Sequence, residues 1–145
     1  MFVCILSFLA IFQSCNNSKV TQSKNNFEVL MASEYGGFGE DKIQIFSNSE
    51  EFNQFWQEVN LDTSLQFPSI DFDKKMVVAK HFQSQRSGGN EFKVHDVNYS
   101  GNEINVIYSA INSSEFGTMA ITNPLIVLVV NKTENPKVNF NTQKK

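Results

Sequence analysis

Residues 125–130 read LIVLVV, an unbroken run of leucine and β-branched residues. Such a run is too short to be a typical helix. It also lacks the alternation of apolar and polar residues that marks a strand with one solvent-exposed face. It is typical of a strand that is covered on both faces. Pro124 stands immediately before the run, where a strand tolerates proline best. We therefore expect residues 125–130 to form a central strand of a sheet.

The rest of the chain supplies further strands around this one. Residues 75–82 read KMVVAKHF, and the apolar run at 76–79 predicts a second strand buried on both faces. Shorter or alternating patterns predict strands at residues 27–31, 42–46, 91–97, 103–109 and 137–140, the last at an edge. Most connections are too short to contain a crossover helix, so we expect about six or seven strands in a mainly antiparallel, curled sheet.

One segment changes from strand to helix periodicity. Four apolar residues recur at positions i, i+3, i+4 and i+7, namely Phe52, Phe55, Trp56 and Val59. This spacing predicts an amphipathic helix over residues 48–60, with a capping box formed by Ser47 and Glu50. The sequence thus indicates a β-rich α+β fold in which one helix packs on the sheet.

The size and charge of the chain restrict its class. It has 145 residues, a length typical of one domain, which we place at residues 27–145. Its 12 basic and 15 acidic residues give a net charge of −3, and Arg86 is its one arginine. A nucleic-acid surface needs clustered Lys and Arg to displace counterions, so we expect no nucleic-acid partner.

The N-terminal residues resemble a bacterial lipoprotein signal. Residues 1–14 read MFVCILSFLAIFQS and have the length and apolarity of a signal peptide, and polar residues follow Cys15 at once. In such signals the cysteine is lipidated and becomes the new N-terminus, so we expect lipid on Cys15 and a flexible tether over residues 15–26. This predicts a protein anchored to a membrane of the cell envelope by lipid. The alternative is that residues 1–14 form a buried strand or helix.

Few residues suggest chemistry. The two histidines, His81 and His95, lack the spacing of a metal site, and no serine lies in a nucleophile-elbow pattern. Asp71 and Asp73 flank Phe72, so in an extended chain their carboxylates would share one side. We expect no catalytic residue, no metal site and no cofactor.

The loop between the strands at 75–82 and 91–97 is a candidate for binding a partner. Residues 83–90 read QSQRSGGN and combine two glycines with the one arginine. The pattern is not a phosphate-binding loop, because a strand and not a helix follows it. The candidate contact residues are Gln85, Arg86, Ser87, Gly88, Gly89 and Asn90, with residues 113–118 as a possible neighbour. A plain connection between strands is the alternative.

Several motifs, taken in order, resemble the PrcB C-terminal-like domain family. They are PSIDFDKKMVVA at residues 68–79, the helix with Glu51-Phe52 and Trp56, Ser87-Gly88-Gly89, and Thr122-Asn123-Pro124 before the apolar strand. The resemblance covers residues 43–130. It implies a binding or assembly module of the bacterial envelope, of the type found in a protease complex, and it supplies no catalytic residues.

These patterns together predict a non-catalytic, lipid-anchored envelope protein that binds another protein and assists a surface protease complex. Two alternatives stay open. The glycine-containing loop at 83–90 would suit a protease inhibitor that inserts a loop between strands into an active site. A small hydrolase would use Asp71 and Asp73 with His81 or His95.

Overall fold

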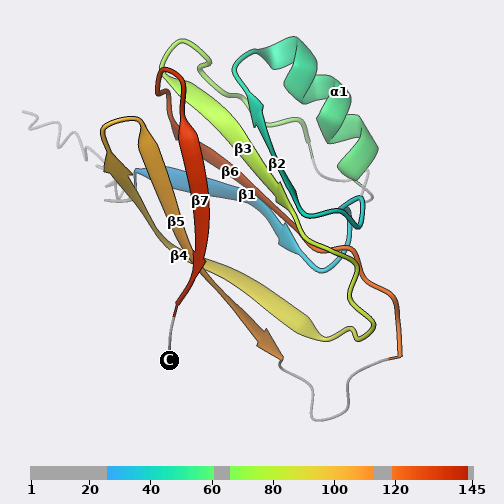
Figure 1. Cartoon of the computed structure of the whole chain (residues 1–145). Coiled ribbons are helices and arrows are strands. Elements are labelled where there is room, and N and C mark those ends of the chain that lie inside the picture. The colour runs from blue at the N-terminus through green and yellow to red at the C-terminus, as the bar shows by residue number, and fades with distance from the viewer. Residues whose placement is uncertain (1–25, 61–65, 113–118, 144–145) are drawn as a thin grey trace, which may run out of the picture.

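A computed structural model describes residues 26–60, 66–112 and 119–143. These residues form one helix and seven strands, which confirms the expected β-rich α+β class. Figure 1 shows their arrangement. The elements are β1 (Phe27–Ser33), β2 (Lys42–Phe46), α1 (Ser49–Val59), β3 (Lys75–His81), β4 (Asn90–Ser100), β5 (Glu103–Asn112), β6 (Leu125–Asn131) and β7 (Lys137–Thr142). Cys15, the segment before it and most of the predicted tether lie outside the described residues.

The strands form two sheets, where one curled sheet was expected. One sheet has the order β1-β6-β3-β2, and the other has the order β4-β5-β7. β6 lies inside the first sheet and β7 at an edge of the second, as predicted. All pairs are antiparallel except β5–β7. That pair is parallel because the chain crosses from β5 to β6 in the other sheet and then returns as β7.

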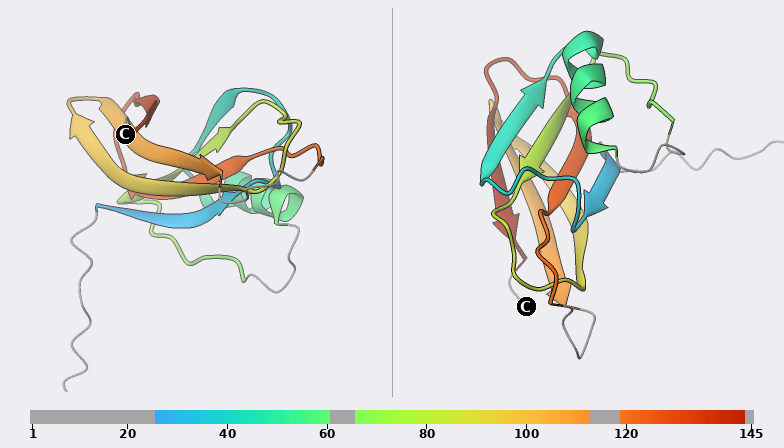
Figure 2. Two further views of the ribbon diagram at one scale, coloured as in Figure 1. Left: turned by 90° about the horizontal axis from the view of Figure 1, so that it is seen from below. Right: turned by 90° about the vertical axis from the view of Figure 1, so that its right-hand side faces the viewer.

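Both faces of β6 are apolar because each face packs into a different core. Leu125, Val127 and Val129 point into a core shared with α1. Ile126, Leu128 and Val130 point into a second core, shared with the three-stranded sheet. β3 divides its residues between the two cores in the same way. The four-stranded sheet is therefore the middle of three layers, with α1 on one face and β4, β5 and β7 on the other (Figure 2).

The four apolar residues that predicted the helix are buried, but the N-cap of the helix differs from the prediction. Phe52, Phe55, Trp56 and Val59 are buried. The N-cap is Asn48, whose side-chain oxygen accepts the backbone N–H of Glu51 at 2.9 Å. The predicted capping box with Ser47 is wrong by one residue, because Asn48 is the residue with the extended backbone that a cap requires.

β4 and β5 make a long hairpin whose turn lies at Gly101. This glycine has φ of +59°, a conformation that other residues adopt at a cost. The register shifts at His95, which is the extra residue of a β-bulge between Val94 and Asp96. None of the described helices is long and apolar enough to span a membrane.

Candidate functional site

The predicted partner-binding loop is tied to the segment that precedes β6. Gln85 and Thr122 form an isolated antiparallel bridge in which each backbone N–H donates to the other carbonyl at 2.9 Å. The backbone N–H of Phe82 also donates to the carbonyl of Pro124, at 3.1 Å. The loop that leaves β3 is thus paired with the chain that enters β6, in continuation of the β3–β6 ladder.

Glu34 closes the other end of the loop. Its Oε2 accepts the backbone N–H of Gly89 at 2.7 Å and that of Asn90 at 3.1 Å. The side-chain amide of Asn90 donates to Oε1 of Gln85 at 2.9 Å. Of the six candidate residues, Gly88 is buried, Gln85, Gly89 and Asn90 are half-buried, and Arg86 and Ser87 are exposed. The six therefore lie together, but only two of them offer their side chains freely to a partner.

A glycine-rich loop joins the same end of the molecule. The N–H of Gly37 donates to the carbonyl of Asn123 at 2.8 Å, and the carbonyl of Gly39 accepts the N–H of Ser84 at 3.3 Å. A Cβ atom on Gly37 would lie 2.5 Å from the carbonyl oxygen of Pro124, so only glycine allows this approach. We call the joined segments 34–39, 82–90 and 119–124 the three-loop face. Residues 113–118, the predicted neighbour, lie outside the described residues.

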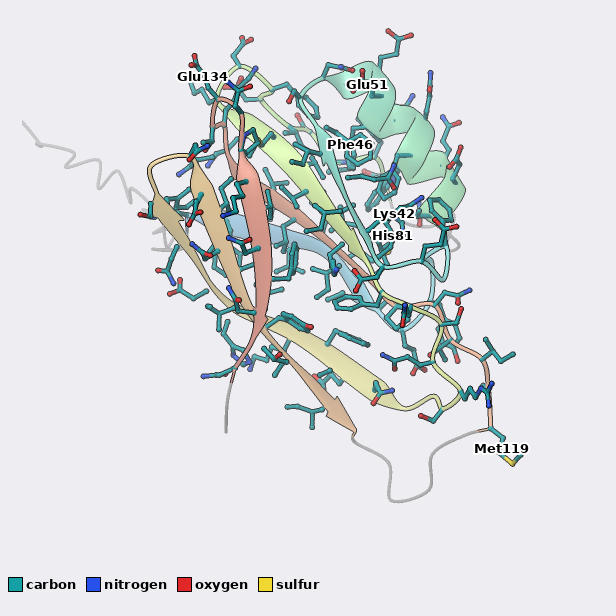
Figure 3. All side chains as sticks on the ribbon, viewed as in Figure 1. Lys42, Phe46, Glu51, His81, Met119 and Glu134 are labelled. Atoms are coloured by element: carbon teal, nitrogen blue, oxygen red, sulfur yellow. The ribbon has the colours of Figure 1, made fainter. Side chains whose placement is uncertain are left out.

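The three-loop face exposes large apolar side chains. The exposed fractions are 46% for Tyr35, 43% for Phe38, 76% for Ile121 and 101% for Met119. Figure 3 shows Met119 projecting away from the body of the protein. The negative charge of Glu34 raises the pKa of the Tyr35 phenol above its ordinary value. Sequence analysis missed this surface, and its only sequence signal is the alternation of aromatic residues with glycine in YGGFG at 35–39.

His81, the last residue of β3, is hydrogen-bonded to the glycine-rich loop. The ring is fully buried, with its Nδ1 accepting the N–H of Phe38 at 3.3 Å and its Nε2 lying 2.8 Å from Oε1 of Gln44. Nδ1 can accept only in the neutral imidazole, so the proton is on Nε2 and is donated to Gln44. The Phe38 ring stacks on His81 with 4.7 Å between centroids. Lys42 and His81 lie close together in Figure 3. Burial, together with Lys42, lowers the pKa of His81 to about 4.

The residues of the hydrolase alternative are not brought together around His81. Asp71 and Asp73 lie before the start of β3, whereas His81 is its last residue. The expected extended chain at Asp71 is wrong, because Asp71 begins a turn and its Oδ1 accepts the N–H of Asp73 at 3.1 Å. Its carboxylate also pairs with Lys74 at 3.0 Å, and this contact lowers the pKa of Asp71.

The second histidine of that alternative lies in a different place. Nε2 of His95 is 2.8 Å from Oγ of Ser109, across the β4–β5 hairpin. His95 also lines an open groove of about 700 Å³ between β1 and β4, beside Glu28 and Lys93. Within the described ranges, no carboxylate hydrogen-bonds to its ring, and no three His, Cys, Asp or Glu residues group as metal ligands. The arrangement is a Ser–His pair without the third group that would orient the imidazole.

No family model, curated protein or solved structure matches this chain. The geometry of the three-loop face is therefore the main basis for assigning a function.

Proposed function

We propose that this protein is a non-catalytic, lipid-anchored protein of the cell envelope that binds another protein through the three-loop face. The observation that carries the proposal is the combination of exposed apolar side chains with an ordered backbone. Tyr35, Phe38, Met119 and Ile121 are exposed on loops that are hydrogen-bonded to one another. Three of these side chains, Tyr35, Phe38 and Ile121, line one pocket, and exposed apolar groups that gather in this way are typical of interaction surfaces. Loops that are already ordered lose little entropy on binding.

Two sequence features support the envelope location and the type of partner. The apolar residues 1–14 and Cys15 have the pattern of a lipoprotein signal. The resemblance of residues 43–130 to PrcB C-terminal-like domains suggests a surface protease complex as the partner assembly. The tethering of the 82–90 loop at Gln85 and at Glu34 favours a broad contact face over a loop that inserts into a cleft.

Photo-crosslinking in intact bacterial cells tests the proposal. A photoreactive residue in place of Met119 or Arg86 should give a discrete crosslinked product, because both side chains project from the three-loop face. The same residue in place of Gln54, exposed on the outer surface of α1, should give none. Equal products from all three positions, or none from Met119 and Arg86, would contradict the proposed face.

The anchor is tested in the same cells. Cys15→Ser should release the protein from the membrane fraction and reduce the Met119 crosslink about tenfold or more, because a tether raises the effective concentration near an envelope partner. Cys4→Ser is the matched control and should change neither result, since Cys4 would be lost with the signal peptide. Retention of the Cys15→Ser protein in the membrane fraction would remove the lipid anchor from the proposal.

A further inference from the structure

A small pocket opens within the three-loop face, next to the C-terminal end of α1. Its volume is about 270 Å³. The side walls are Tyr35, Phe38, Ile121 and Glu58, and the backbone of Gly36 and Gly37 contributes to the lining. A Cβ atom on either glycine would meet the protein's own backbone, at Val59 or at Pro124, so the two glycines let the loop lie close against the end of α1 and the chain before β6. The pocket therefore combines three apolar or aromatic side chains with the carboxylate of Glu58 and with Asn123.

The size of the pocket suits a single side chain. Sites for small molecules and cofactors usually measure about 300–1,000 Å³. A cavity of about 270 Å³ is smaller than this range. Protein interfaces, in contrast, often concentrate their binding energy in one anchor side chain that fills a preformed pocket. The rings of Tyr35 and Phe38 provide the apolar and aromatic contacts that such an anchor requires.

The charges at the pocket favour a cationic neighbour for that anchor. Glu58 lies in the last turn of α1, which contains no basic residue. The carbonyl oxygen of Val59, at the end of α1, lies close to Gly36, since a Cβ atom on this glycine would be 3.1 Å from it. The C-terminal end of a helix is the negative end of its dipole and stabilises cations. The residues that line the pocket include no Lys, Arg or His.

We propose that this pocket receives an apolar side chain of the partner protein, flanked by a lysine or arginine that pairs with Glu58. The inference rests on the proposed function and specifies the segment that the three-loop face recognises. The anchor packs between Tyr35, Phe38 and Ile121, and the adjacent cation lies over the end of α1. The glycine-rich loop is held in place by Asn123 and His81, so the pocket exists before the partner arrives.

A titration of the ¹⁵N-labelled full chain with capped tripeptides tests this inference by NMR. The probes are acetyl-Lys-Phe-Lys-amide, acetyl-Glu-Phe-Glu-amide and acetyl-Lys-Ala-Lys-amide. We expect Lys-Phe-Lys to shift the amide signals of residues 35–38, 58 and 121–123 at millimolar concentrations. The other two peptides should bind at least about fivefold more weakly, because one repels Glu58 and the other lacks the anchor.

Two variants separate the pocket from general charge effects. Glu58→Gln should remove most of the preference for Lys-Phe-Lys over Glu-Phe-Glu. Glu51→Gln changes another exposed glutamate, in the first turn of the same helix, and should leave that preference intact. Equal shifts with both charged peptides, or shifts outside the pocket only, would overturn the inference. If Glu58→Gln also leaves the Met119 crosslink in cells unchanged, the partner-binding function stands and the pocket is not its anchor point.

Discussion

Replacement of Phe52 by alanine should lower the free energy of unfolding by about 3–5 kcal/mol. Phe52 is fully buried at the centre of the core between α1 and the four-stranded sheet. Its ring centroid lies 5.9 Å from that of Phe46, 5.7 Å from that of Trp56 and 5.4 Å from that of Phe67. Truncation removes one partner from each of these pairs and leaves a cavity between α1 and the sheet.

Urea denaturation of the full chain measures this effect. Gln54→Ala is the matched control, because Gln54 is exposed on the same helix and alanine is a good helix former. It should change stability by less than about 0.5 kcal/mol. A loss below about 1 kcal/mol in Phe52→Ala would contradict the placement of this ring at the centre of the helix-side core.

Acidification from pH 7 to pH 4 should remove about 3 kcal/mol of stability through His81 alone. Burial lowers the pKa of this imidazole from 6.5 to about 4 in the folded protein. Between these two pKa values, His81 is therefore protonated in the unfolded chain and neutral in the folded protein. The contribution is fully present above pH 6.5, falls as the pH decreases through this interval, and reaches its full loss below pH 4.

The difference between wild type and His81→Gln isolates this histidine from the carboxylates that also titrate at low pH. Unfolding free energies measured at pH 7, 6, 5 and 4 should show a shallower decline in His81→Gln. His95→Gln is the control. Its unfolding free energy should fall as steeply with pH as that of the wild type, because His95 is an exposed residue on the β4–β5 hairpin, where it contacts Ser109. Parallel curves for wild type and His81→Gln would show that His81 takes up its proton without disturbing the fold.

Much of the fold could be predicted because its deciding patterns are local. The continuous apolar run at 125–130 indicates a strand without a wet face, and β6 is indeed covered on both sides. Alternation in β4 and β5 indicates one buried face, but it does not identify what covers that face. For this reason the division into two sheets could not be inferred. Asn48 and Ser47 both precede a glutamate by three residues, so the pattern alone did not identify the cap.

The candidate site was less accessible to sequence analysis, because its contacts join distant residues. The loop at 85–90 could be selected for its glycines and Arg86, but its closure depends on Glu34, which is 55 residues from Gly89. Nothing in the sequence near Ile121 indicates that it lies across from Tyr35 and Phe38. The pocket arises from three segments that meet only in the folded chain.

The position of β6 also constrains the order in which the protein can be assembled. β6 bridges β1 and β3 and supplies alternate side chains to both cores, yet it begins at residue 125 of 145. Neither core can close until residue 131 has been synthesised, and contacts of such long range form slowly. A nascent chain of this design therefore lacks both complete cores until late in its synthesis, and the free β4–β5 hairpin and the edges of β1 and β3 stay unpaired until β6 arrives.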